Sequence, residues 1–268
     1  MAPTYLDSIV AWHKHRASID GRPLSRLVSA TDRLLPTRGF SSRLRKGDSV
    51  AVIAEIKRRS PSKGALVPSL DVAGLARRYE SAGASCMSVL TDSEHFGGSI
   101  NDLQTARAAT DLPVLRKDFT VDLRDVCDAR LMGADCVLLI AAVLSQDQLR
   151  DMLSMARDIG IDALVEVHDE REVARAVECD AILIGVNQRD LVTFDVDHER
   201  AVRMGSVIPE ACVRVAESGI RGGDDATSLA QAGYDALLVG EHLVRAENTE
   251  TALVELIVPR NTARATSF

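Results

Sequence analysis

Eight short apolar segments that alternate with helical segments constrain the fold of this chain more than any other feature of its sequence. The segments are rich in β-branched residues or leucine and lack clean polar alternation, which is typical of parallel strands covered by helices on both faces. They lie at residues 51–57, 86–91, 112–116, 136–140, 162–167, 181–186, 212–216 and 236–240. We therefore predict eight strands at these positions.

Helical segments separate the predicted strands, and we expect helices over residues 72–81, 123–132, 146–159 and 224–232. Gly83, Gly133 and Gly233 follow three of them, at the position where helices often end. Eight such units in about 210 residues match a closed (β/α)8 barrel, the TIM barrel, in count and size. A doubly wound α/β sheet is the alternative, but no GxGxxG motif follows a strand and eight equal units favour closure.

The first 47 residues do not follow this repeat. They contain two amphipathic helical segments, and Leu6, Ile9 and Val10 form an apolar stripe on the first. A closed barrel has no sheet edge to offer, so the stripe is expected to pack on an end or a flank of the barrel. We predict an N-terminal helical extension at residues 1–47, the barrel at 48–258, and a disordered C-terminal tail at 259–268.

Charge and composition exclude several classes of function. Hydrophobic residues make up 46% of the 268-residue chain, which indicates a globular protein rather than a disordered one. The formal net charge of −7 argues against non-specific binding to nucleic acid or to membranes. We therefore expect neither partner, although a basic pocket for an anionic small molecule is compatible with this charge.

Cysteines, histidines and the N-terminus point to a cytoplasmic protein without a metal. The five cysteines form no CxxC pair, and the six histidines show no HExxH or comparable ligand spacing. Residues 1–10 lack the apolar core of a signal peptide, and no apolar run approaches membrane length. We expect reduced thiols, a cytoplasmic location and no metal ion.

Polar residues gather where the predicted strands end. Glu55 and Lys57 are two apart near the end of the first strand, so both side chains point the same way. A buried charge is costly unless it is paired, and barrel enzymes place their chemistry at the carboxyl ends of the strands. Other strand ends carry further polar residues, namely Lys117, Glu166, Asn187, Arg189, Glu217 and Ser218. Each alone is compatible with a solvated strand end, but their convergence on one rim indicates an active site.

The last two predicted strands end in Ser218-Gly219 and Gly240-Glu241. Glycine lets backbone N–H groups approach an anion closely, and the loops after strands seven and eight of this fold often bind phosphate. A tight-turn role would also explain each glycine. Lys57 and Ser60 add a cation and a hydroxyl group from the neighbouring first strand. We predict a phosphate site here.

Six motifs in the order AEIKRRSPSKG, LRKDF, LVEVH, GVNQRDL, AESGI and LLVGE closely resemble those of the indole-3-glycerol-phosphate synthase family. The resemblance covers nearly the whole chain, including the N-terminal extension. It implies a carboxy-lyase of tryptophan biosynthesis that needs no cofactor. The family converts 1-(2-carboxyphenylamino)-1-deoxyribulose 5-phosphate to indole-3-glycerol phosphate with loss of CO2 and water.

The resemblance also implies residue roles. Lys117 is similar to the family's general acid, which protonates the ketone oxygen during ring closure. Lys57 resembles the residue that pairs with the substrate carboxylate, and Glu166 resembles the group that assists dehydration. The residues that match the orienting polar ring are Glu55, Asn187, Glu217 and Ser218. Those expected to bind the substrate or its phosphate are Lys57, Ser60, Phe96, Phe119, Arg189, Gly219, Leu238, Gly240 and Glu241.

Two residues at the rim call for separate expectations. Glu241 is next to the phosphate glycine, so we expect its backbone N–H to bind and its side chain to turn away. We interpret His168 as a rim histidine with satisfied hydrogen bonds. We also expect a phosphorylated small-molecule substrate and a monomer or weak homodimer.

Two other functions fit part of the pattern. A lysine at a barrel strand end near phosphate loops also describes a Schiff-base aldolase with Lys117 as nucleophile. That chemistry needs a lysine of depressed pKa, whereas carboxylates crowd this rim. A barrel kept only as an interaction module is the other alternative, and it would not require the polar residues at the strand ends.

Overall fold

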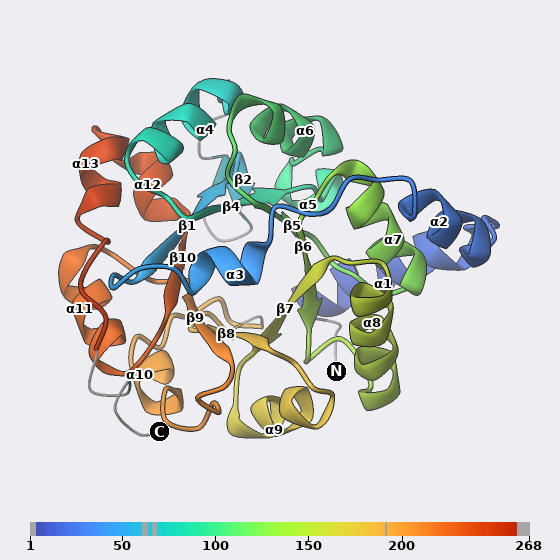
Figure 1. Cartoon of the computed structure of the whole chain (residues 1–268). Helices are drawn as coiled ribbons and strands as arrows, with labels where there is room; N and C mark the ends of the chain where they lie inside the picture. The colour runs from blue at the N-terminus through green and yellow to red at the C-terminus, as the bar shows by residue number, and fades with distance from the viewer. Residues whose placement is uncertain (1–3, 61–63, 66–68, 191, 262–268) are drawn as a thin grey trace.

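The computed structural model describes residues 4–60, 64–65, 69–190 and 192–261, and it forms a closed barrel of eight parallel strands (Figure 1). Strand β1 pairs with both β10 and β4, which closes the sheet. The strands are β1 (Ala51–Ile56), β4 (Cys86–Leu90), β5 (Val114–Lys117), β6 (Cys136–Ile140), β7 (Asp162–Val167), β8 (Leu183–Asn187), β9 (Val213–Glu217) and β10 (Ala236–Val239). The predicted TIM-barrel fold is confirmed.

Helices surround the barrel as the periodicity predicts. They are α4 (Val72–Ser81), α5 (Ser93–Phe96), α6 (Ile100–Ala109), α7 (Leu123–Met132), α8 (Gln146–Asp158), α9 (Glu170–Glu178), α10 (Arg200–Met204), α11 (Gly223–Gln231), α12 (Glu241–Arg245) and α13 (Thr249–Val254). Side-chain caps mark several starts, such as Asp71 before α4 and Ser145 before α8. Gly83 and Gly133 have φ values of +94° and +96°, so the expected glycine helix ends are present.

Strand limits differ from the expected ones by one or two residues. Lys57 lies beyond β1 rather than within it, and the strand expected at 112–116 begins only at Val114 and continues to Lys117. Pairing with neighbouring strands sets these limits, and apolar runs in the sequence do not report pairing. A short antiparallel hairpin of β2 (Arg59–Ser60) and β3 (Gly64–Ala65) lies in the loop after β1 and was not predicted.

The strands carry two different cores on their two faces. Outward residues such as Val52 and Ala54 belong to the large apolar layer between the barrel and its helices. Inward residues form a second cluster that includes Ile53, Leu115 and Leu164. The inward series of β1 reads Ala51, Ile53 and Glu55, so the interior changes from apolar to charged toward the carboxyl ends of the strands. This change places the polar site at one end of the barrel.

The N-terminal extension contacts both ends of the barrel and one flank. Helix α1 (Tyr5–Ser18) buries Ile9 in the interior cluster with Phe119, at the carboxyl end of β5. Helix α2 (Leu24–Thr31) packs on α7. Helix α3 (Phe40–Leu44) lies across the opposite opening, at the centre of Figure 1, where Ser41 binds Asp162 at the start of β7.

The end of the described chain returns to the start of the barrel. Pro259 forms an isolated β-bridge with Ser49. The backbone N–H of Arg260 donates to the backbone oxygen of Asp48 at 2.8 Å. Residues 262–268 of the tail expected to be disordered lie outside the described residues. The limits of the three predicted segments, 1–47, 48–258 and 259–268, remain a prediction.

Candidate active site

A cavity of about 710 Å³ opens at the carboxyl ends of the strands. Its walls include the predicted site residues Glu55, Lys57, Phe96, Lys117, Phe119, Glu166, Asn187, Arg189, Glu217, Ser218, Gly219, Leu238, Gly240 and Glu241. Ser60 is the one predicted residue that cannot be assessed, because its side chain lies outside the described part of the chain. The structure therefore brings these predicted residues together at the carboxyl ends of the strands.

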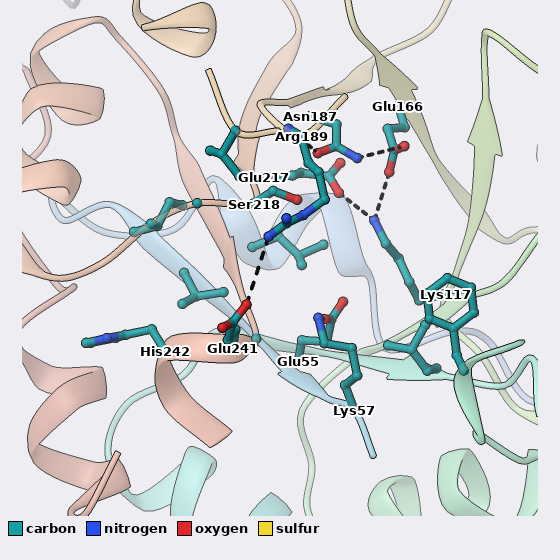
Figure 2. Close-up of a pocket in the computed structure, with 18 of the residues that line it drawn as sticks. Glu55, Lys57, Lys117, Glu166, Asn187, Arg189, Glu217, Ser218, Glu241 and His242 are labelled. Atoms are coloured by element: carbon teal, nitrogen blue, oxygen red, sulfur yellow. Dashed lines mark hydrogen bonds and ion pairs between the residues drawn. The ribbon is translucent and has the colours of Figure 1, made fainter. Parts of the chain in front are cut away.

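Lys117 lines the cavity, and its ammonium group lies between Glu166 and Glu217 (Figure 2). Its ammonium group donates to Glu166 Oε2 at 2.9 Å and to Glu217 Oε2 at 2.5 Å. Burial opposes its charge, but Glu166, Glu217 and Glu55 outweigh burial and raise the pKa of Lys117 above its ordinary value. Lys117 is thus a protonated donor that points into the cavity.

The two glutamates on Lys117 have different surroundings. Glu166 Oε1 also accepts a hydrogen bond from Asn187 Nδ2 at 3.1 Å, whereas Glu217 Oε1 has no partner among the described residues. Burial raises the pKa of both groups. In Glu166 the charge and hydrogen bonds of Lys117, His168 and Asn187 reverse this and lower the pKa below its ordinary value. In Glu217 burial and the Glu166 charge prevail over Lys117, so the pKa is raised.

Two glycines make room for the buried carboxylates. A Cβ atom on Gly185 of β8 would collide with Glu217 Oε1 and lie 3.1 Å from Leu164 Cδ1. A Cβ atom on Gly240 would collide with Glu55 Oε1. The sequence interpretation of Gly240 as a phosphate glycine did not include this second requirement, because only the closed barrel brings Gly240 beside Glu55.

Lys57 and Glu55 form the ion pair that their spacing indicates. Lys57 Nζ donates to Glu55 Oε1 at 2.6 Å, and the side chain of Lys57 is 18% exposed while that of Glu55 is 5% exposed. Tyr79 supports the strand from outside the barrel by donating its hydroxyl to the Glu55 backbone oxygen at 3.0 Å. Lys57 is therefore a cation on the cavity wall that a substrate anion can reach.

The loops after β9 and β10 border another part of the cavity. Ser218 and Gly219 both have positive φ values, +66° and +71°, which turn the backbone sharply after β9. Such a conformation is unfavourable for serine, and strained backbone of this kind is frequent at functional sites. His198 lies against this turn and also lines the cavity.

We expected the Glu241 side chain to turn away from the phosphate site, but Glu241 lines the cavity and its carboxylate lies near two arginines. Its Oε2 lies 3.9 Å from Arg189 Nη2, and its Oε1 lies 3.3 Å from Arg245 Nη1. Figure 2 shows the Glu241 carboxylate pointing toward Arg189 across the cavity. Arg189 supplies the cation that makes this orientation favourable, and the sequence does not reveal that contact.

Aromatic rings form a further wall. Phe96 and Phe119 have ring centroids 6.4 Å apart, and His13 of α1 lies 5.4 Å from Phe119. Sequence reasoning missed Phe194, which lines the cavity. The centroid of its ring lies 5.5 Å from that of Tyr5 of α1. Sequence reasoning also missed lining residues with ionisable side chains, namely Asp92, Asp118, His198, Arg221, His242 and Arg245. Most of these lie in loops, where periodicity gives no signal.

One group of side chains in the described residues has the composition of a metal site. Ligand-type atoms of His13, Asp92 and His95 lie within 4.8 Å of one another. Asp92 Oδ2 is 2.9 Å from His13 Nε2 and 3.0 Å from His95 Nδ1, so hydrogen bonds to one carboxylate account for this arrangement. These bonds join α1 to the loop after β4.

Comparison with known proteins places the chain in a family. The family model described as indole-3-glycerol phosphate synthase matches residues 6–256. A protein of that name from Kineococcus radiotolerans is 47% identical over 238 residues, which cover 87% of each chain. The one from Mycobacterium ulcerans is 44% identical over 262 residues, 96% of this chain and 95% of its relative. Indole-3-glycerol phosphate synthase 1 from Streptomyces coelicolor is 51% identical over 212 residues, 79% of each chain.

Solved structures of low identity agree with the fold alone. A 3-hexulose-6-phosphate synthase from Salmonella typhimurium matches with a TM-score of 0.62 at 13% identity, over 77% of this chain and 96% of that one. A thiamine phosphate pyrophosphorylase from Pyrococcus furiosus matches with a TM-score of 0.58 at 18% identity, over 77% and 93%. Within the described residues, no helix has both the length and the apolar character needed to span a membrane.

Proposed function

The chain belongs to the indole-3-glycerol phosphate synthase family, and from this premise we propose how its cavity carries out the family's reaction. The enzyme is a carboxy-lyase of tryptophan biosynthesis. It closes the ring of 1-(2-carboxyphenylamino)-1-deoxyribulose 5-phosphate, with loss of CO2 and water, to give indole-3-glycerol phosphate. The residue roles below are our proposal.

The position of Lys117 is the observation that carries the proposal. Ring closure joins a carbon of the aromatic ring to the ketone carbon, and negative charge develops on the ketone oxygen. An ammonium group that faces the cavity and keeps its proton near neutral pH is suited to protonate that oxygen. Lys117 is the general acid of this step.

Lys57 binds the carboxylate of the substrate before it leaves as CO2. Its ammonium group is partly exposed and already pairs with one carboxylate, Glu55. A substrate carboxylate can share this cation, while Glu55 keeps the lysine protonated. The departing CO2 leaves its bonding electrons in the ring, where they neutralise the iminium nitrogen.

Dehydration follows, and Glu166 acts as its base. The lowered pKa of Glu166 keeps the carboxylate ionised, so it can accept the proton that the new ring must lose. Lys117 regains a proton from solvent and donates it to the hydroxyl group, which leaves as water. Asn187 and Glu217 hold Glu166 and Lys117 in place, and Glu55 and Ser218 complete the ring of orienting groups.

The two ends of the substrate bind to different walls. Gly219, Gly240 and the backbone N–H of Glu241 receive the phosphate, with Ser60 and Arg189 as polar partners. Phe96 and Phe119 pack on the aromatic half, and Leu238 contributes the apolar floor beneath the substrate. A substrate with a dianion at one end and a ring at the other is thereby fixed in one orientation.

The raised pKa of Lys117 argues against the Schiff-base aldolase alternative. A Schiff base requires an unprotonated amine, and the carboxylates around Lys117 favour the ammonium form. Borohydride treatment in the presence of a phosphorylated ketose separates the two. We expect no covalent adduct on Lys117, and a trapped adduct would favour the aldolase.

Lys117→Met tests the central assignment. The variant keeps a side chain of similar length but has no proton to give, so we expect kcat to fall by about 10²–10⁴-fold. Indole fluorescence follows the product, and circular dichroism checks that the barrel is folded. A folded variant with unchanged kcat would exclude Lys117 from the mechanism.

We further propose a cytoplasmic enzyme that needs no cofactor or metal and acts as a monomer or weak homodimer without nucleic-acid or membrane partners. All five cysteines are buried and free of disulfides, which supports a reducing compartment. Ultracentrifugation of the purified enzyme tests the oligomeric state.

A further inference from the structure

His168 lies two residues after Glu166, at the end of β7, and it belongs to a chain of three ionisable side chains. Its Nδ1 is 3.1 Å from Glu172 Oε2 on α9, and its Nε2 is 3.7 Å from Glu166 Oε1. The order is therefore carboxylate, imidazole, carboxylate. Glu172 is at the outer end of the chain and Glu166 is at the cavity.

The hydrogen bonds fix which nitrogen carries a proton. A carboxylate only accepts, so the Glu172 bond requires a proton on Nδ1 of His168. The backbone N–H of His168 donates to the same Glu172 oxygen at 2.7 Å, which holds that carboxylate in position. Nε2 is the remaining site of titration. It is buried and has no hydrogen-bond partner among the described residues, contrary to our expectation of a satisfied rim histidine.

The environment of the ring favours the imidazolium form. Burial lowers the pKa of His168, but Glu172 and Glu166 outweigh it and raise the pKa above the ordinary value. Arg200 of α10 opposes this effect, and Asp190 in the loop after β8 is a further charged group near His168. In this form Nε2 presents positive charge to Glu166.

The proposed reaction makes such a second cation necessary. Within the described part of the chain, Lys117 is the one cation of the resting site that bonds to both Glu166 and Glu217, which are 2% and 1% exposed. Once Lys117 has given its proton to the ketone oxygen, two buried carboxylates face a neutral amine. A buried carboxylate without a cation gains a proton readily, and a protonated Glu166 is not a base.

We infer that His168 is a positioning residue that keeps Glu166 ionised while Lys117 is without its proton, and that Glu172 holds His168 in the orientation and protonation state for this task. The inference rests on the proposed roles of Lys117 and Glu166. His168 does not contact the substrate and transfers no proton in this scheme. It acts by its charge alone.

His168→Asn is the first test. The asparagine amide can still donate to Glu172, but the variant lacks Nε2 and its charge. We expect kcat on the acid limb of its pH profile to fall by up to about tenfold, the effect of one pKa unit in Glu166, with KM nearly unchanged. Because the carboxylate loses a cation, the acid limb of the kcat profile moves to higher pH. His15→Asn, an exposed histidine of α1, is the matched control and leaves the profile in place.

Glu172→Gln is the second test, and for this variant we predict a shift in the alkaline limb of the pH profile of kcat. Without the Glu172 charge, the pKa of His168 falls, so the imidazolium is lost at lower pH. The alkaline limb of kcat should therefore move to lower pH, while His168 keeps a hydrogen-bond acceptor. This variant also serves if His168→Asn does not fold.

Glu166→Gln, measured in parallel, separates the possible failures. Suppose that Glu166→Gln is inactive, whereas His168→Asn and Glu172→Gln both keep the wild-type pH profile of kcat. The role of His168 is then wrong and that of Glu166 stands. A fall in kcat without any shift in the limbs would make His168 a structural residue and would also overturn the inference. An active Glu166→Gln enzyme would overturn the role of Glu166 itself, and the inference with it.

Discussion

At the scale of single residues, the site depends on where side chains are missing as much as on where they are present. Gly185 and Gly240 leave the space that Glu217 and Glu55 occupy. Since protein interiors are close-packed, even one methyl group at these positions must displace a carboxylate. The charged ring of the cavity therefore depends on two glycines, of which Gly185 has no substrate contact in our proposal.

Gly185→Ala should separate folding from catalysis. The new methyl group pushes Glu217 away from Lys117, and a displacement of about 1 Å in such a group can cost about 10²-fold in rate. We expect a folded enzyme whose kcat is reduced by up to about 10²-fold. Steady-state kinetics and a melting curve measure both effects.

Gly21→Ala is the control for this variant, because a Cβ atom there meets nothing within 4 Å. It should keep wild-type kinetics. If Gly185→Ala has the same kcat and KM as Gly21→Ala, Glu217 can move without a loss of activity.

At the scale of elements, α1 is a wall of the site rather than a separate domain. Ile9 is 2% exposed and lies in the interior cluster, and Tyr5 packs on Phe194 of the cavity. A truncation of residues 1–40 would also remove Phe40, which is fully buried at the opposite end of the barrel. Deletion of residues 1–22 isolates the effect of α1.

We expect the 1–22 deletion to leave a folded barrel with a raised KM and a lower kcat, because water then reaches the ring-closure step. Ile9→Ala should act in the same direction and lower the free energy of unfolding by about 2–5 kcal/mol. Ile19→Ala makes the same change at a residue that is 71% exposed and should have little effect. If the deletion variant keeps the wild-type kcat/KM, α1 supports the barrel but has no role in catalysis.

The attachment of α1 should weaken in acid. Burial opposes the charge of Asp92, but hydrogen bonds from His13 and His95 prevail and lower its pKa to about 2. A lowered carboxyl pKa adds stability above the unfolded-state value of about 4, and this is lost as the pH falls toward about 2. Urea unfolding of the wild type and Asp92→Asn should therefore differ by about 1.5–3 kcal/mol near neutral pH.

That difference should narrow as the pH falls from about 4 toward about 2, where the Asp92 carboxyl becomes uncharged in the folded as well as in the unfolded protein. A constant difference over this range would mean that the Asp92 charge does not hold α1.

At the scale of the whole molecule, the reactivity of the cysteine thiols indicates whether the barrel is closed. Cys86 and Cys136 are inward residues, and burial raises their pKa well above the ordinary value. Burial also raises the pKa of Cys127 to about 11. Thiol reagents attack the thiolate, so native protein should react slowly.

We expect all five thiols to become reactive together when urea unfolds the protein, with the midpoint that circular dichroism gives. Coincident transitions would show that the barrel unfolds as one unit. Rapid reaction of a thiol in native buffer would reveal local opening of the barrel.

The sequence by itself determined the fold class, the order of the elements and the rim residues. It could do so because strand and helix periods are local, and because a parallel barrel brings the carboxyl end of every strand to one rim. The spacing of Glu55 and Lys57 indicated that their side chains point the same way, and the two form an ion pair in the structure.

Only the tertiary structure decided which charges meet. Lys117 joins Glu166 and Glu217 from strands 49 and 100 residues away along the chain. The same holds for the contact of Glu241 with Arg189 and for the unsatisfied Nε2 of His168. Electrostatic energy depends on distance and burial, and both are set by closure of the barrel rather than by neighbours in the chain.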